Sequence, residues 1–362
     1  MSCFIFKHII RAAAGLMLFL PACALGEPGE PELPSDLPPH SNASAPSPEQ
    51  NSFTPAAAPQ APAPDQEQTG LPAPVPECWQ KLVERLAGDG LDQIWLESVF
   101  SRLSEGFTDT PMKVKLKELY KIKFGKRRPV NQADKEKVRY LPNILTEENT
   151  QRALEFLEQH EKIFLAAEAV YGVPKEVAVS LLLVETRLGA YLGRQPCLRN
   201  LASMATSTEK ETFYAYLPSV RNDPVKEAWM QDVLNKRSEW AYKELKALLQ
   251  HSCLNDLDPL SLYGSVYGAI GYCQFMPTNI PVYGTDGNKD GKINLFEPAD
   301  AIFSLSNFLR QHGWTPRADS AKQRKALLSY NRSSAYANTI LKMADDLRKR
   351  EQENAQAGTG EN

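Results

Sequence analysis

One stretch of this 362-residue chain, from Pro174 to Gly189, constrains the fold more than any other. Proline suits the first turn of a helix and glycine suits the residue just past its end, so this stretch is predicted to be one helix. Six of the eight residues from 177 to 184 are Val or Leu. Because a helix that is apolar on nearly every side is buried, the rest of the fold must pack around this one.

The remaining folded sequence also favours helices. Leucine, tryptophan and phenylalanine recur at helical spacing between 79 and 100, and a long amphipathic pattern predicts helix from Thr146 to Tyr171. No segment alternates between apolar and polar residues as a half-buried strand would. The predicted class is therefore mainly α, with short β pieces around 191–225 and 263–300.

The N-terminus predicts export. Basic residues precede an apolar run (12–20) that has the length of a signal peptide and is too short to span a bilayer. The run ends in Leu20-Pro-Ala-Cys23, which resembles the lipidation site of bacterial lipoproteins; simple cleavage after Ala24 is the alternative. Residues 26–77 are rich in proline and cannot bury a core, so they are predicted to form a disordered tether. The predicted divisions are a signal peptide (1–23), a linker (24–77), a helical N-terminal region (78–160), a catalytic core (161–348) and a disordered tail (349–362).

Charge and cysteine content exclude other classes of protein. The net charge is only −3, whereas a nucleic-acid-binding protein is usually basic, so no nucleic-acid partner is expected. No Cys-x-x-Cys pair occurs, which argues against a zinc site. An exported chain permits disulfides among Cys78, Cys197, Cys253 and Cys273, but free thiols are equally compatible with the sequence.

Glu185 lies near the C-terminal end of this apolar helix. Its helical neighbours three and four residues away are leucines and Gly189, and Arg187 should point elsewhere. Burial and the negative end of the helix dipole should raise the pKa of this carboxyl, as a general acid requires near neutral pH. The alternative is a structural glutamate that pairs with a distant arginine.

Two further blocks carry polar chemistry. Glycines punctuate the segment 264–277, called here the glycine loop, in which Ser265 and Gln274 could bond sugar hydroxyls and Phe275 could stack on a sugar ring; an ordinary core loop is the alternative. The segment 286–300, called here the acidic loop, has the spacing of an EF-hand. Its predicted ligands for a structural Ca²⁺ are Asp286, Asn288, Asp290, the backbone carbonyl of Lys292 and a distal acid, Glu297 or Asp300.

Together these blocks resemble a known family. The strings Tyr171-Gly-Val-Pro, Val184-Glu-Thr-Arg and Gly271-Tyr-Cys-Gln-Phe-Met-Pro277 are similar to the motifs of the membrane-bound lytic murein transglycosylase B family. The resemblance implies a lysozyme-like fold with Glu185 as its acid/base, and it favours Asp300 as the distal calcium ligand. It also implies substrate contacts at Ser265, Gln274, Phe275, Tyr330, Asn331, Arg237 and Trp240, with Tyr330 also bonded to Glu185.

The activity that the resemblance implies is cleavage of the β-1,4 bond between N-acetylmuramic acid and N-acetylglucosamine in peptidoglycan, leaving 1,6-anhydromuramyl ends. Catalysis would need no cofactor, and Glu185 is the only carboxylate in a convincing setting. Asp256 and Asp258 are expected to cap a helix. The alternatives are a hydrolytic muramidase and a calcium-stabilised wall-binding lipoprotein without activity. The expected protein is a periplasmic monomer, held at the outer membrane's inner face through Cys23.

Overall fold

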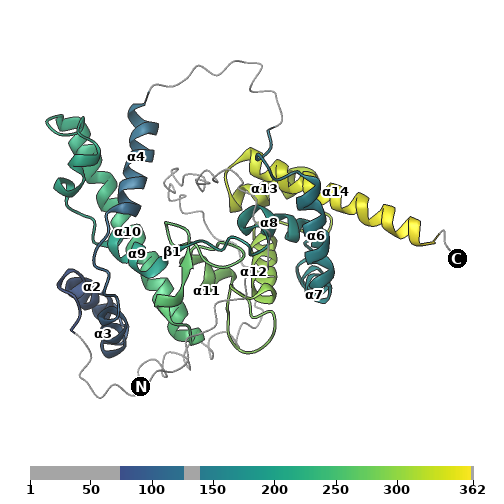
Figure 1. Cartoon of the computed structure of the whole chain (residues 1–362), viewed down its shortest axis with the longest axis horizontal. Coiled ribbons are helices and arrows are strands. Elements are labelled where there is room, and N and C mark those ends of the chain that lie inside the picture. Colours follow the sequence, from purple (N-terminus) through teal and green to yellow (C-terminus); the bar gives the residue numbers. More distant parts are fainter. Residues whose placement is uncertain (1–73, 126–138, 360–362) are drawn as a thin grey trace, which may run out of the picture.

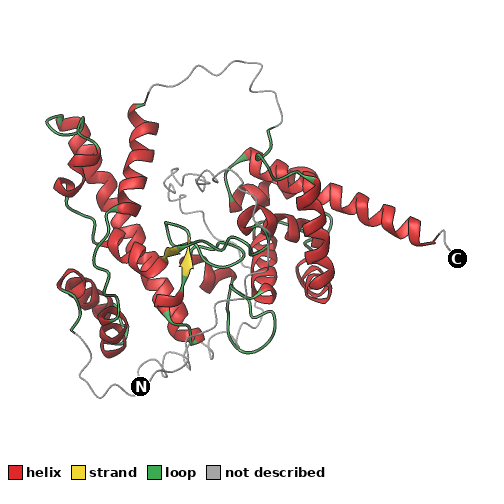
Figure 2. Cartoon of the chain, viewed as in Figure 1, coloured by secondary structure: helices red, strands yellow, loops and turns green. Residues whose placement is uncertain are grey.

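A computed structural model describes residues 74–125 and 139–359, and nearly all of its regular structure is helical (Figures 1 and 2). The mainly α class is therefore confirmed. The signal peptide, Cys23 and most of the predicted linker lie outside the described residues. The elements are α2 (Glu77–Gly88), α3 (Gln93–Ser101), α4 (Thr110–Phe124), α6 (Glu147–Gln159), α7 (Glu161–Tyr171), α8 (Lys175–Thr186), β1 (Gln195–Pro196), α9 (Cys197–Ala205), η1 (Lys210–Tyr216), α10 (Pro224–Asn255), η2 (Pro259–Ser261), β2 (Tyr263–Gly264), η3 (Pro277–Asn279), α11 (Ile280–Tyr283), α12 (Pro298–Gln311), α13 (Ser320–Tyr330) and α14 (Ser334–Thr359).

The apolar helix is α8, and it is the central helix of its group. Every residue from Glu176 to Leu183 is buried, and α6, α7, α12 and α14 pack around it. A second group, α2, α3, α4 and α9, lies against or near the long helix α10 on the other side of the view in Figure 1. Burial of this apolar stretch, as the sequence predicted, fixes the position of Glu185 at the end of α8.

Two expectations about helices were wrong in detail. The amphipathic pattern from 146 to 171 forms two helices, because the backbone leaves helical geometry at His160 (φ −116°), where α6 ends and α7 begins. The tail from 349, expected to be disordered, continues α14 to Thr359. Most residues of this tail are good helix formers. The tail is also held to α8 by an ion pair of 2.5 Å between Glu351 and Lys175 Nζ.

The short β pieces occur where they were expected. β1 pairs antiparallel with β2, with Gln195 opposite Gly264 and Pro196 opposite Tyr263. This ladder joins the segment after α8 to the start of the glycine loop, so it links the two blocks that carry the predicted chemistry. Within the described ranges, no helix is both long and apolar enough to cross a membrane.

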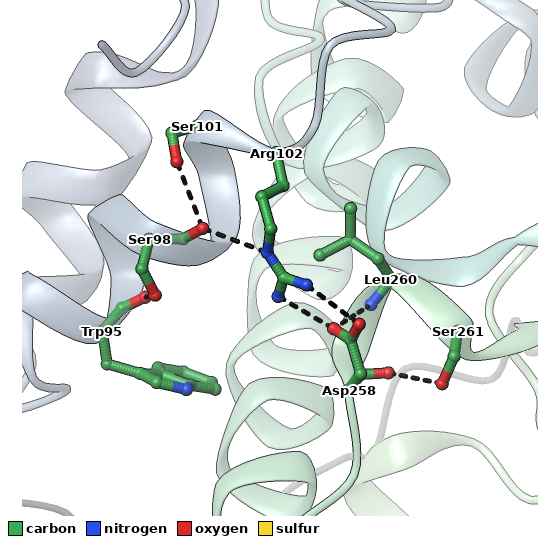
Figure 3. A network of polar contacts seen from close by, with 7 residues as sticks. All are labelled: Trp95, Ser98, Ser101, Arg102, Asp258, Leu260 and Ser261. Atoms are coloured by element: carbon green, nitrogen blue, oxygen red, sulfur yellow. Dashed lines mark hydrogen bonds and ion pairs between the residues drawn. The ribbon is translucent and has the colours of Figure 1, made fainter. Parts of the chain in front are cut away.

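Figure 3 shows how the N-terminal helices are fixed to the segment before the glycine loop. The Arg102 guanidinium, at the end of α3, donates two hydrogen bonds of 3.0 and 2.9 Å to the Asp258 carboxylate. Asp258 also accepts the Leu260 N–H at 3.2 Å and so caps η2, as expected. Asp256 instead ends α10 in the left-handed conformation (φ +55°). Both aspartates thus have structural roles at the ends of helices.

Candidate active site

The Glu185 carboxyl lies one residue before the end of α8, partly buried, and it meets a phenol from the far end of the chain. The Tyr336 hydroxyl, on α14, donates a 2.6 Å hydrogen bond to Glu185 Oε1. Burial raises the pKa of Glu185 to about 7, and the bond from Tyr336 opposes part of that rise. No charged side chain of the described residues perturbs it, so the arginine-paired alternative is not what the structure shows.

A sharp reversal of the chain follows Glu185. Arg187, Leu188 and Gly189 all have positive φ (53°, 61° and 87°), and only glycine adopts this region at low cost. A Cβ on Gly189 would lie 2.2 Å from the Tyr272 ring, so glycine is required here by close packing as well. Arg187 points away from Glu185, as predicted, and donates to the Asn143 carbonyl at 3.1 Å.

The glycine loop is bonded directly to the end of α8. The Thr186 hydroxyl donates to the Tyr272 carbonyl at 3.0 Å, next to Glu185 in the chain. Gln274, itself in a left-handed conformation (φ +49°), donates through Nε2 to the carbonyls of Leu192 (3.2 Å) and Gly271 (3.0 Å). Its amide therefore holds the loop against the segment after α8. A role in binding sugar stays a prediction for its Oε1.

Ser265 and Phe275 differ in what they can offer. Ser265 Oγ is partly buried and accepts the backbone N–H groups of Tyr267 and Ala269, which shapes the loop. Phe275 is 1% exposed and packs among the rings of Tyr283, Phe308 and Tyr330. The expectation that Phe275 presents a face to a sugar is therefore wrong, because its ring belongs to the core.

The late Tyr-Asn pair sits close to the acid, but with different bonds from those expected. Tyr330 donates to the Cys273 carbonyl and not to Glu185, so that prediction is wrong. Its ring stacks at 6.4 Å on Tyr336, the true partner of the acid, which the sequence had not singled out. Asn331 ends α13, and its buried Oδ1 has no partner among the described residues.

The predicted pair Arg237 and Trp240 lies on α10, in the other group of helices. Trp240 packs against the hydrophobic core. Burial lowers the pKa of Lys115, and the nearby Arg237 charge lowers it further. Burial raises the pKa of Tyr267, in the glycine loop, and the Arg237 charge opposes that rise. The structure thus brings Arg237 near the glycine loop and shows no contact of either residue with Glu185.

The acidic loop has part of the geometry that a calcium loop needs. Asp286 accepts the N–H groups of Asp290 (3.1 Å) and Gly291 (2.7 Å), which curls the backbone around the first predicted ligand. The Asn288 amide donates to Asp290 Oδ2 (3.2 Å) and Glu297 Oε2 (2.8 Å), so three oxygen-bearing side chains meet there. These oxygen donors are of the type that calcium prefers.

Asp300, the favoured distal ligand, accepts hydrogen bonds from backbone N–H groups of the loop. Asp300 is 1% exposed and accepts the N–H groups of Gly287 (2.8 Å) and Asn294 (2.6 Å), so it ties the two ends of the loop together. The Lys292 amine lies 3.5 Å from Asp256. The backbone carbonyl of Lys292 stays a predicted ligand. In the described part of the chain no three His, Cys, Asp or Glu side chains converge as a metal cluster. Asp300 as a ligand stays a prediction.

Cys197 and Cys273, the two buried free thiols of the described residues, add no reactive centre. Cys78, Cys197 and Cys273 are free thiols. Cys273 is buried beside Glu185, and its burial raises the pKa of its thiol far above the usual range. A group that stays protonated in this way is a poor nucleophile or metal ligand.

The arrangement defines a class of site: a single carboxyl that holds its proton near neutral pH, at the end of a buried helix in a mainly α fold. Comparisons with known proteins show the family to which a chain with this fold belongs. The profile of the Transglycosylase SLT domain family matches residues 75–324, and the chain belongs to that family. The match ends before Tyr330, Asn331 and Tyr336, which contribute to the site from α13 and α14.

Individual relatives are similar in sequence or fold. Membrane-bound lytic murein transglycosylase B of Escherichia coli is 35% identical over 177 residues, which is 49% of this chain and 42% of the relative. The matched region thus spans less than half of that enzyme's length. The E. coli lytic transglycosylase Slt35, solved in complex with calcium, has a TM-score of 0.56 at 22% identity over 76% of this chain and 93% of that one.

A further neighbour is SltB3 of Pseudomonas aeruginosa, solved in complex with NAG-anhNAM-pentapeptide. It has a TM-score of 0.53 at 20% identity and covers 75% of this chain and 78% of its own. At these identities the two structures show a shared fold, which is the lytic-transglycosylase architecture expected from the sequence.

Proposed function

We propose that this protein is a lytic transglycosylase that cleaves the β-1,4 bond between N-acetylmuramic acid and N-acetylglucosamine in peptidoglycan and leaves 1,6-anhydromuramyl ends. The observation that carries the proposal is the lone Glu185 carboxyl, with a pKa of about 7 and one neutral hydrogen-bond donor. Hydrolytic glycosidases generally use two carboxylates. A site with one suits a reaction in which the substrate supplies its own nucleophile.

The first step is proton donation by Glu185. Because Tyr336 donates to Oε1, the transferable proton lies on Oε2. Oε2 gives this proton to the bridging oxygen as the bond from C1 of the muramyl sugar breaks, and the acetamido group of that sugar stabilises the cation at C1. Tyr336 then stabilises the carboxylate that forms, since a hydrogen bond to the charged state favours it.

The second step returns the proton. The Glu185 carboxylate accepts the proton of the C6 hydroxyl while the C6 oxygen bonds to C1 of the same sugar. The 1,6-anhydro ring closes, Glu185 is protonated again, and no water is consumed. Asn331, whose Oδ1 has no partner among the described residues, is proposed to orient an N–H or O–H of the sugar once the substrate reaches it.

The test is wall lysis by Glu185→Gln compared with a matched variant on the same helix, Glu176→Gln. Glu176 is also buried on α8, but it lies 3.4 Å from the Arg348 guanidinium, and nine residues of helix, about 13 Å, separate it from Glu185. Loss of turbidity clearing on purified peptidoglycan by the first variant alone supports the proposal. Retained clearing by Glu185→Gln would overturn it.

Product analysis separates the proposal from its alternatives. A hydrolytic muramidase on the same fold would add water, so its muropeptides would be ~18 Da heavier by mass spectrometry than anhydro products. A wall-binding protein without activity would give neither product while still sedimenting with peptidoglycan. Anhydro ends from the wild type, absent with Glu185→Gln, are the expected result.

A structural Ca²⁺ in the acidic loop is part of the proposal. The curl around Asp286 and the meeting of Asn288, Asp290 and Glu297 support it, as does the relative solved with calcium. Calcium at a hundredfold excess over Kd should stabilise the folded protein by about 2.7 kcal/mol relative to a chelator, and so raise its unfolding temperature. Asp286→Asn should remove this response. A calcium response that survives in this variant would contradict the site.

The proposed location is the periplasm, on the inner face of the outer membrane, through lipid on Cys23. The signal-like N-terminus and the membrane-bound relative support this location. Fractionation of cells that express the full chain or Cys23→Ser tests it: the first should remain with membranes and the second should be released. The protein is proposed to act as a monomer, which light scattering can check.

A further inference from the structure

The segment directly after the catalytic helix presents an exposed aromatic ring and a cation that the reaction does not use. The Tyr191 N–H donates to the Thr186 carbonyl at 2.8 Å, so its backbone is held one residue from Glu185. The neighbouring Leu192 carbonyl accepts the Gln274 amide at 3.2 Å. The segment is therefore fixed between the acid and the glycine loop.

Rigid backbone supports the segment from behind. Gly193 has φ +98°, and a Cβ there would lie 2.1 Å from the Gly264 carbonyl oxygen. The two backbone segments are therefore in direct contact, with no room for a side chain between them. Two residues on, Gln195 pairs with Gly264 in the β1–β2 ladder. Residues 191–194 thus form a supported platform whose position relative to Glu185 is set by the fold.

The chemistry of this platform differs from that of the rings around Glu185. Tyr336 and Phe275 are 2% and 1% exposed, whereas Tyr191 is 57% exposed. The exposed Arg194 guanidinium lies 5.6 Å from the centre of the Tyr191 ring. None of the ion pairs among the described residues involves Arg194. An open aromatic face suits the apolar face of a sugar ring, and an adjacent cation without an acid suits a carboxylate.

We propose that Tyr191 and Arg194 form an outer subsite for a muramyl sugar, in which the Tyr191 ring stacks on the sugar and Arg194 pairs with a carboxylate that the sugar carries. This proposal rests on the proposed function, because it takes peptidoglycan as the substrate. A muramyl sugar carries a carboxylate on its lactyl group, or on the peptide attached there. N-acetylglucosamine carries no carboxylate, so the subsite would distinguish a muramyl sugar from N-acetylglucosamine beside the cleaved bond.

Binding measurements in a Glu185→Gln background test the subsite apart from catalysis. Isothermal titration would use three tetrasaccharides: peptide-bearing muramyl, peptide-free muramyl, and uncharged chitotetraose. Arg194→Ala should weaken binding of a muramyl ligand about three- to fivefold and leave chitotetraose unchanged, as expected for an exposed charge pair. Tyr191→Ala should weaken all three about fivefold. The matched control is Arg221→Ala, since Arg221 lies 5.8 Å from the Tyr214 ring on η1 and should have no effect.

Each outcome decides the proposal. A loss confined to the peptide-bearing ligand assigns Arg194 to a peptide carboxylate. A loss confined to the peptide-free ligand assigns it to the lactyl carboxylate, which becomes an amide once a peptide is attached, and a loss with both muramyl ligands shows that Arg194 pairs with either carboxylate. An equal loss with chitotetraose, no loss at all, or an equal effect of Arg221→Ala would overturn the subsite. Charge-selective binding by a protein that cleaves no peptidoglycan would refute the proposed function and leave the subsite standing.

Discussion

Glu185→Gln should stabilise the folded protein at alkaline pH and not at acidic pH. Burial raises the pKa of this carboxyl from 4.5 to about 7 in the folded state. The folded protein therefore holds the proton more tightly than the unfolded chain does, and stability is lost as the pH rises from about 4.5 to about 7. One pKa unit corresponds to 1.36 kcal/mol, so the full loss is about 3 kcal/mol; partial exposure of the side chain reduces the expected value to about 2 kcal/mol.

The assay is urea unfolding of wild type and variant at pH 4.5 and pH 8. The difference between the two proteins isolates Glu185, since all other titrating groups are shared. A glutamine at 185 cannot ionise, so the variant should gain about 2 kcal/mol over wild type on going from pH 4.5 to pH 8. Glu158→Gln, at an exposed position on α6, is the control and should show no such gain. A difference that stays the same at both pH values would refute the raised pKa.

Three further outcomes follow from named contacts. Tyr336→Phe removes the hydroxyl that lowers the pKa of Glu185, so the alkaline limb of the activity profile should move up by about 0.5–1 pH unit; an unmoved limb would separate Tyr336 from the acid. Gly189→Ala combines φ +87° with a contact 2.2 Å from the Tyr272 ring, and should cost about 2–4 kcal/mol in chemical unfolding, against under 1 kcal/mol if the turn can relax. Phe275→Ala should cost about 3–5 kcal/mol as a core cavity, whereas a sugar-stacking residue would lose affinity with little loss of stability.

The position of the acid could be predicted from sequence because its cause is local. A run of Val and Leu with proline before it and glycine after it specifies a buried helix, and one carboxylate at its end then lacks solvent. The short β pieces around 191–225 and 263–300 were also found. These signals act within a few residues along the chain.

The failures involve information that lies outside the local sequence. Tyr336 is 151 residues from Glu185, and nothing in its own segment marks it as the donor. Phe275 follows glycines and looks like a loop residue, but three other rings enclose it. The break at His160 carries neither glycine nor proline, so a continuous amphipathic pattern concealed it.

The place of Tyr336 on α14 determines how the catalytic unit can be divided. The family match ends at residue 324, ten residues before α14 begins at Ser334. A fragment cut there would keep Glu185 but lose the phenol, and it would also lose Ile340, Met343 and Leu347, whose side chains are buried in the same core. A fragment that keeps this core complete therefore has to extend beyond Leu347, and a boundary taken from sequence similarity alone would expose the apolar surface that these side chains cover.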